Sequence, residues 1–298
     1  MINIKFYCPR WGSEKTSWSD FTNQVKAEGF DGVEVFPLQN EHEKNLMLPC
    51  LESAGLEFSL INAELKEGRD FIKYIQRFEQ NLYALASFNS GDFKPQFITS
   101  QTGRDYYTKD QMAECFAISQ RFSNETGIPI YHETHRNKWS FAAHIVKDYL
   151  QDFPFLQLTL DLSHWVCVSE SFLEDQQEAV DLAILHSMHL HARVGHTEGP
   201  QVTDPWAPEN HEALQHHLKW WDQWVCCLHE KRLKHCTITP EFGPYPYMPY
   251  HPNTNIPIAS QWEINCWMKN LLKKRYNGPK LKTLLNNTGH SSTVKSFY

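Results

Sequence analysis

The segment MHLHARVGH, residues 188–196, alternates apolar and polar side chains over its first six positions. Positions 188, 190 and 192 carry Met, Leu and Ala, whereas positions 189, 191 and 193 carry His, His and Arg. This period of two predicts a strand with one apolar and one polar face. The apolar face can pack against helices, and the polar face suits the mouth of a barrel, where water and ligands can satisfy it. Residues 157–161 and 237–241 repeat the pattern.

Strand-like runs alternate with helical segments along most of the chain. The expected strands are residues 3–7, 32–36, 57–61, 96–99, 130–133, 157–161, 188–193 and 237–241. The expected helices lie near 18–28, 41–54, 68–87, 108–126, 139–151, 173–186, 209–231 and 258–275. Strict alternation predicts a parallel sheet, and eight units predict an α/β fold, a closed (β/α)8 TIM barrel in a single domain at residues 1–276. A doubly wound open sheet usually has a glycine-rich turn after its first strand, and CPRWGSEK at 8–15 is not one.

The composition is that of one large globular domain. The chain has 298 residues, 41% of them hydrophobic, and a net charge of −7. This acidic balance argues against a general nucleic-acid binder, which usually carries a basic face. Residues 277–298 are rich in Ser, Thr, Asn and Lys, and we expect them to form a polar extension outside the barrel.

Cysteine usage and hydropathy indicate the compartment. The eight Cys are scattered and include no C-x-x-C pair, which is typical of reduced core residues rather than of a disulfide frame. The N-terminal segment MINIKFYCPRWG starts with a strand-like run, and no stretch of about 18 apolar residues is present. We therefore expect a cytoplasmic protein with no signal peptide and no membrane partner.

Four expected strands in the second half of the chain end in charged groups. The segments PIYHETHR, LTLDLSHW, MHLHARVGH and ITPEFGP place Glu133, Asp161, His191 and Glu241 at these ends. Strand ends at one face are where barrels keep their chemistry. Three carboxylates brought together repel one another, and a divalent metal beside one imidazole relieves that repulsion. The alternative is a set of structural ion pairs with Arg136, Lys138 and Arg193.

The chain resembles the xylose-isomerase-like TIM-barrel superfamily of sugar phosphate isomerases and epimerases, ketose 3-epimerases, hydroxypyruvate isomerase and inosose dehydratase. The motifs that carry the resemblance are GFDGVEV at 29–35, the Glu at 133, D-x-x-H at 161–164, H-x-R at 191–193 and PEFG at 240–243. The resemblance implies that Glu133, Asp161, His191 and Glu241 hold one metal. It also implies that His164 contacts the substrate and that Arg193 binds a substrate oxygen.

Further residues are candidates for substrate binding. Glu34 ends the second strand pointing inward, where family members often line the pocket, although a structural hydrogen bond fits equally well. His135 and Arg136 follow Glu133 and could bind substrate or form a surface loop pair. The Pro- and Tyr-rich segment 243–257 leaves directly from the Glu241 strand, so we expect it to lie over the barrel mouth.

These features predict an isomerase or epimerase that acts on a sugar or polyol through an enediolate. The cofactor would be one divalent ion, Mn, Mg, Co, Fe or Zn, and Glu133 and Glu241 would remove and return the proton. The alternatives are an inosose-type dehydratase, a metal hydrolase like the abasic-site endonucleases, and a non-catalytic sugar-binding barrel. The endonucleases need three zinc ions, and the early segments LINAEL and FITSQTG lack the extra His. The expected partner is a small molecule and not nucleic acid, and a homo-oligomer is compatible with the sequence.

Overall fold

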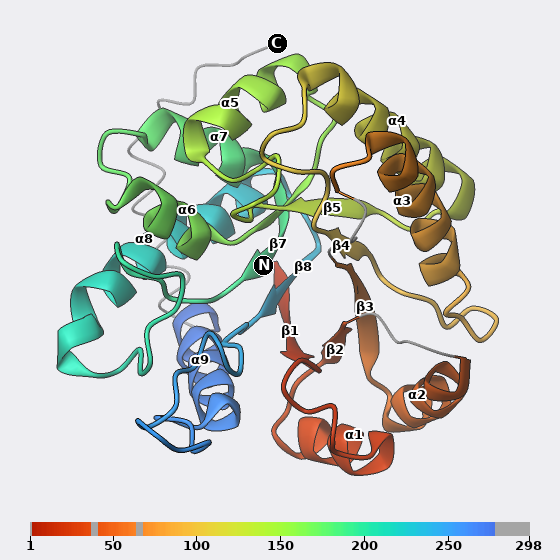
Figure 1. Ribbon diagram of the computed structural model, residues 1–298. Helices are drawn as coiled ribbons and strands as arrows, with labels where there is room; N and C mark the ends of the chain where they lie inside the picture. Colours follow the sequence, from red (N-terminus) through yellow and green to blue (C-terminus); the bar gives the residue numbers. More distant parts are fainter. Residues whose placement is uncertain (1, 37–40, 64–67, 278–298) are drawn as a thin grey trace.

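The computed structural model describes residues 2–36, 41–63 and 68–277, and these form a barrel of parallel strands surrounded by helices (Figure 1). The strands are β1 Asn3–Pro9, β2 Gly32–Val35, β3 Glu57–Asn62, β4 Ile98–Ser100, β5 Ile130–Glu133, β6 Leu158–Leu160, β7 Ser187–His191 and β8 His235–Thr239. The helices are α1 Trp18–Ala27, α2 Glu41–Ala54, α3 Phe71–Ala86, α4 Lys109–Thr126, α5 Ala143–Asp152, α6 Leu162–Ser169, α7 Gln177–His186, the short 3-10 helix Pro208–Asn210, α8 His211–Glu230 and α9 Gln261–Tyr276.

The sheet closes on itself in chain order. Each strand pairs in parallel with its sequence neighbours, and β8 pairs with β1 through the register Asn3 to His235. The predicted (β/α)8 TIM barrel is therefore confirmed. The extension expected at 277–298 lies outside the described residues except for Asn277, which caps α9.

Several element boundaries differ from the expectation, and one helix was not predicted. The strands expected at 157–161, 188–193 and 237–241 end one or two residues earlier, because Asp161, Arg193 and Glu241 continue the extended chain beyond the last paired residue. Helix α6 begins immediately after β6. The Asp161 side chain caps it by accepting a hydrogen bond from the Ser163 N–H.

The floor of the barrel is packed with side chains. Tyr7 donates a hydrogen bond to Glu57 at 2.8 Å, and its ring stacks against Phe97 at 6.1 Å. Phe97 in turn stacks on Tyr131 at 5.0 Å. A Cβ on Gly32 would lie 2.6 Å from the Tyr7 ring, so glycine at this position leaves space for that ring. Aromatic rings therefore fill the barrel near the N-terminal ends of its strands.

The helices form the outer layer of the core. Apolar side chains of the strands, such as Leu158, Leu160 and Leu190, are fully buried beneath them. No helix among the described residues is long and apolar enough to cross a membrane. The eight Cys are free, which agrees with the expectation of reduced residues.

Candidate metal centre at the barrel mouth

Four predicted ligands converge at the ends of four consecutive strands. Glu133 ends β5, Asp161 follows β6, His191 ends β7 and Glu241 follows β8. One ligand atom from each lies within 4.8 Å of those of the other three. Their residues are between 0% and 3% exposed, so the carboxylates are almost completely removed from water. The structure thus brings together the set on which the metal prediction depends.

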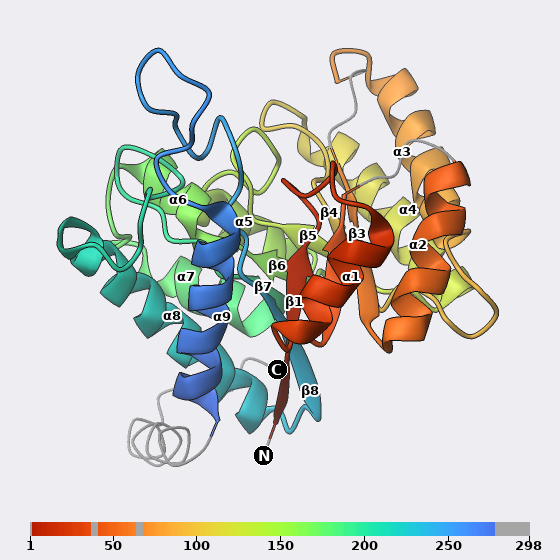
Figure 2. The same ribbon diagram turned by 90° about the horizontal axis from the view of Figure 1, so that it is seen from below.

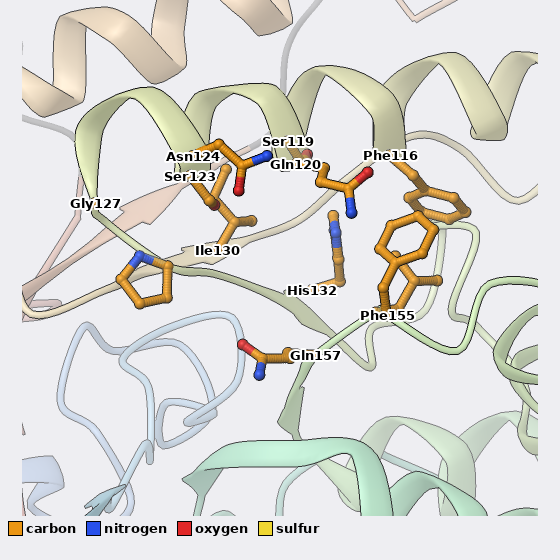
Figure 3. Close-up of a pocket in the computed structure, with 12 residues that line it drawn as sticks. Phe116, Ser119, Gln120, Ser123, Asn124, Gly127, Ile130, His132, Phe155 and Gln157 are labelled. Carbon is orange, nitrogen blue, oxygen red and sulfur yellow. The ribbon is translucent and has the colours of Figure 1, made fainter. Parts of the chain in front are cut away.

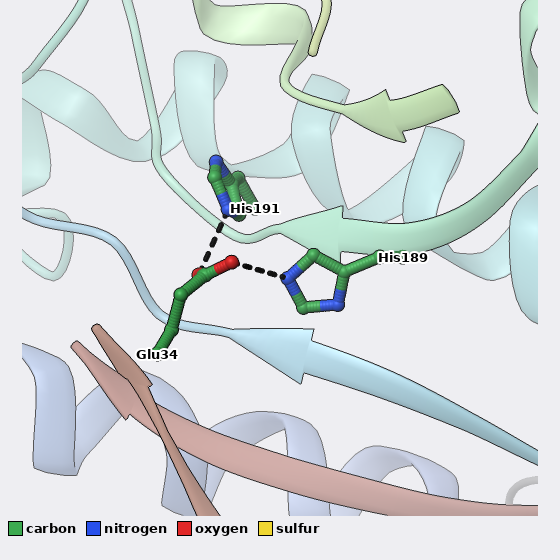
Figure 4. Close-up of side chains that lie close together, drawn as sticks. All are labelled: Glu34, His189 and His191. Atoms are coloured by element: carbon green, nitrogen blue, oxygen red, sulfur yellow. Dashed lines mark hydrogen bonds and ion pairs between the residues drawn. The ribbon is translucent and has the colours of Figure 1, made fainter. Parts of the chain in front are cut away.

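The two ring nitrogens of His191 face different carboxylates. Its Nε2 lies 2.9 Å from Glu34 Oε2 (Figure 4). Its Nδ1 lies 3.2 Å from Glu133 Oε1 and 2.9 Å from Glu241 Oε2. A neutral imidazole that donates its Nε2–H to Glu34 keeps the Nδ1 lone pair for a cation. Without a cation, the pKa of His191 is raised well above its usual value, since Glu241 and Glu34 outweigh the lowering by burial.

Glu34 lies below His191, toward the barrel interior. Its Oε1 accepts a hydrogen bond from Thr99 at 3.0 Å and lies 3.6 Å from His189 Nε2. Although burial alone would raise the pKa of Glu34, the charges of His191 and His189 and their hydrogen bonds hold it well below the usual range. Both of its oxygens therefore contact protein groups. Of the two alternatives given for Glu34 from the sequence, this geometry shows the structural hydrogen bonds.

Asp161 is held from both sides. Its Oδ1 accepts hydrogen bonds from the Ser163 N–H at 3.0 Å and the Ser163 hydroxyl at 2.5 Å. Its Oδ2 accepts from Arg193 Nη2, which also lies 3.1 Å from Glu241 Oε2. Arg193 is only 1% exposed, and although burial would lower its pKa, Asp161 and Glu241 raise it. The sequence analysis did not identify Ser163 as a hydrogen-bond donor to Asp161. A Ser two residues after an Asp is, however, compatible with the start of a helix.

Acidic side chains outnumber permanently charged basic ones at the mouth, and this excess of negative charge suits a metal cation. Glu133, Asp161, Glu241 and Glu34 are acidic, and the permanently charged Arg193 pairs with Asp161 and Glu241 alone among them. Glu133 Oε2 is buried with no hydrogen-bond partner. Glu241 Oε2 is close enough to His191 and Arg193 for ion pairing but lacks the alignment of a hydrogen bond.

The pKa shifts of two of these acids follow from the same imbalance. Burial, together with the charges of Glu241 and Asp161, raises the pKa of Glu133 despite its contact with His191. In Glu241, the charges of His191 and Arg193 outweigh burial and lower the pKa. Buried carboxylate oxygens without donors, beside one imidazole nitrogen, fit a divalent cation. An oxygen-rich set with one nitrogen suits Mn, Mg, Fe or Co, and also accepts Zn.

A second group lies next to the first and is surrounded by positive charge. The rings of His135 and His164 are 4.0 Å apart, and with Glu133 they have the spacing of a three-ligand set. Burial and the charges of Lys138, Arg193 and Arg136 lower the pKa of His135. Those charges would repel a second cation, so one ion suits the mouth better than a cluster.

The loop between β8 and α9 rises beyond the strands on the side of α6 (Figure 2), and its Tyr247 contacts residues of the mouth. The ring centroid of Tyr247 lies 4.7 Å from Arg193 Cζ and 5.0 Å from Arg136 Cζ. Trp11 packs edge-on against Tyr247 at 5.3 Å. Gly243 anchors the loop through two hydrogen bonds with Gln201, at 2.7 and 3.2 Å. The expected position of the 243–257 segment is thus observed for its first part.

A separate cavity of about 240 Å³ lies outside the barrel (Figure 3). It is lined by α4, β5 and the segment before β6, including Gln120, Asn124, His132 and Gln157. His132 Nδ1 lies 2.8 Å from Thr102 Oγ1, and burial lowers the pKa of His132 to about 3. This cavity contains none of the converging acids, so we place the candidate site at the mouth instead.

No protein-family model matches the chain, and no curated protein is significantly similar to it.

Solved structures with the same fold are found. A probable 3-DHS dehydratase from Bacillus anthracis is 18% identical, with a TM-score of 0.57 over 92% of this chain and 100% of that chain. A D-psicose 3-epimerase from Clostridium cellulolyticum H10, solved with D-tagatose, is 14% identical, with a TM-score of 0.53 over 97% and 98%. A xylose isomerase-like TIM barrel protein from Mycobacterium smegmatis, solved with magnesium, is 10% identical, with a TM-score of 0.57 over 95% and 97%.

The matching structures cover several activities. They include an endonuclease IV as well as epimerases and a dehydratase. At identities this low, the likeness shows the fold and leaves the activity to the geometry of the site. The chain therefore has the fold of the xylose-isomerase-like TIM barrels.

Proposed function

We propose that the chain is an enzyme that uses one divalent metal ion to isomerise or epimerise a sugar or polyol. The observation that carries this proposal is the convergence of Glu133, Asp161, His191 and Glu241 within 4.8 Å in a buried, acid-rich setting. When bound, a divalent cation would polarise a carbonyl and a neighbouring hydroxyl, which acidifies the C–H between them. The partner is then a small molecule, and the net charge of −7 does not favour nucleic acid.

The residues of the chain supply the rest of the chemistry. Glu133 ends β5 and Glu241 follows β8, the first and last of the four strands, and one could take a proton from carbon while the other returns one. Arg193 lies against Glu241 and can donate to an oxygen that gains negative charge as the enediolate forms. Tyr247 and Trp11 cover this region and limit the access of water.

The test is solvent deuterium exchange into a panel of ketoses, followed by NMR with Mn²⁺-loaded protein. We expect exchange at the carbon beside the carbonyl for the true substrate. Glu133→Gln and Glu241→Gln should each lower the rate by about 10² or more, because each removes a positioned acid or base. The control is Glu57→Gln in the floor of the barrel, which should retain the exchange rate.

Three outcomes would contradict the proposal. A product lighter by one water would identify a dehydratase. Metal-dependent cleavage of abasic DNA would identify a hydrolase. Stoichiometric metal and tight sugar binding without exchange on any ketose would identify a binding protein. Circular dichroism of each variant would establish that a lost rate does not reflect a lost fold.

A further inference from the structure

His164 lies between two arginines, one on each ring nitrogen. Its Nε2 is 3.0 Å from Arg193 Nη2, and its Nδ1 is 3.4 Å from Arg136 Nη1. An imidazole can accept at most one hydrogen bond in any protonation state, whereas a guanidinium group can only donate. One of these two contacts therefore lacks an acceptor, whichever tautomer His164 adopts.

Arg193 has an unused donor, and Arg136 has no carboxylate partner among the described residues. Arg193 Nη1 is buried and has no hydrogen-bond partner. Among residues 2–36, 41–63 and 68–277, no carboxylate lies within ion-pair distance of Arg136, which is half-buried in the loop after β5. Burying unsatisfied donors is costly, so an acceptor at this place would stabilise the arrangement.

Both guanidinium groups, of Arg136 and Arg193, lie near the Tyr247 ring. The Cζ atoms of Arg136 and Arg193 lie 5.0 and 4.7 Å from its centroid. Like charges brought this close repel each other, and Asp161 and Glu241 contact only the Arg193 side. We call Arg136 and Arg193 the arginine pair. It forms a positively charged flank of the acidic metal centre.

We propose that the arginine pair binds an oxyanion, a carboxylate or a phosphate, carried by the substrate. This inference rests on the proposed function, since it assigns the oxyanion to a molecule that also occupies the metal centre. Arg193 links the two sites because it donates to Asp161 of the metal set. The substrate class is then an anionic hydroxycarbonyl compound rather than a neutral sugar.

Calorimetry with the full chain loaded with Mn²⁺ tests the proposal with three related ligands. Dihydroxyacetone is neutral, dihydroxyacetone phosphate carries a phosphate, and hydroxypyruvate carries a carboxylate. We expect at least one anionic ligand to bind about tenfold or more tightly than dihydroxyacetone, as hydrogen bonds to charged groups allow. The tighter of the two anions identifies which oxyanion the pair prefers.

Arg136→Gln is the decisive variant, because Arg136 makes no hydrogen bond or ion pair with the four metal residues among the interactions of the described residues. It should bring the preference for the anion close to unity while leaving Mn²⁺ affinity unchanged. Arg121→Gln, an exposed arginine paired with Glu79 on the outside of the barrel, is the matched control and should keep the preference. Titration of metal-free protein with inorganic phosphate separates binding by arginine from binding by metal.

The outcomes distinguish the two proposals. Equal binding of neutral and anionic ligands, or an unchanged preference in Arg136→Gln, would overturn the oxyanion site while leaving metal-dependent exchange on neutral ketoses intact. Conversely, an arginine-dependent preference for phosphate in a protein that binds no Mn²⁺ would keep the oxyanion site and refute the proposed enzyme.

Discussion

At the scale of single residues, the orientation of His191 depends on Glu34. The carboxylate of Glu34 occupies the Nε2 side of the ring at 2.9 Å, and this leaves Nδ1 directed toward Glu133 and Glu241. Glu34 is itself fixed by Thr99, which lies 3.0 Å from its other oxygen and also from Thr159. We therefore propose that Glu34 positions His191.

Glu34→Gln is expected to weaken Mn²⁺ binding by about 10- to 100-fold, because partners of a metal-binding imidazole contribute on this scale. The measurement is Mn²⁺ titration calorimetry, with the fold verified by circular dichroism. Glu57→Gln replaces another carboxylate in the same barrel, but one that pairs with Lys5 and Tyr7 in the floor, so it should not change metal affinity. Unaltered Mn²⁺ affinity in a folded Glu34→Gln protein would remove the positioning role.

Alternation in the sequence predicts which residues point into the barrel but not what they touch. Glu34 and His191 are 157 positions apart, and their contact requires closure of the whole sheet. The alternation with a period of two predicts that Glu34 and His191 both point into the barrel. It gives no information about the distance between these two side chains. The same limit applies to Arg136, whose position beside His164 depends on a loop that follows no periodic pattern.

At the scale of elements, α6 shows why one helix was not predicted from the sequence. Its segment LSHWVCVS contains Trp, two Val and Cys, which are also common in strands, and it begins without a connecting loop. Asp161 continues the inward alternation of β6 and also caps α6, so one residue belongs to both patterns. The presence of strands β5–β8, and of polar residues at or just after their ends, was predicted correctly because alternation with a period of two is a local pattern.

The loop after β8 can be tested through Tyr247. Tyr247→Ala removes the ring that lies over both arginines and against Trp11, so we expect kcat/KM to fall about tenfold, mostly through KM. Steady-state kinetics and light scattering should be measured together. Ile256→Ala, at a position 62% exposed in the same loop, is the control and should leave both unchanged. A changed oligomer size with unchanged KM would instead assign the loop to assembly.

At the scale of the whole molecule, the excess of acid at the mouth links metal binding to stability. A ligand that binds only the folded state stabilises it by about 2.7 kcal/mol at a hundredfold excess over Kd. Glu133 Oε2 is buried without a hydrogen-bond partner, and a bound cation would supply one.

We therefore expect Mn²⁺ to raise the Tm by about 5 °C and EDTA to reverse the rise. Elemental analysis should find about one metal per chain at saturation. Glu133→Gln should melt higher than the unsubstituted chain without metal and gain less when Mn²⁺ is added, because it removes one of the crowded charges. A stoichiometry of three zinc ions, or a Tm indifferent to every divalent ion, would contradict the single-site view.

The stacked rings of Tyr7, Phe97 and Tyr131 fill the barrel near the N-terminal ends of its strands. We therefore expect substrate to enter, and product to leave, at the C-terminal ends. Glu34 and His189 lie between these rings and the metal set, with His189 Nε2 3.6 Å from Glu34 Oε1, so we expect this end of the site to be closed by protein side chains. We therefore expect substrate analogues to bind when they are lengthened at the end that faces the open mouth. Analogues lengthened at the end that faces the aromatic rings should not bind.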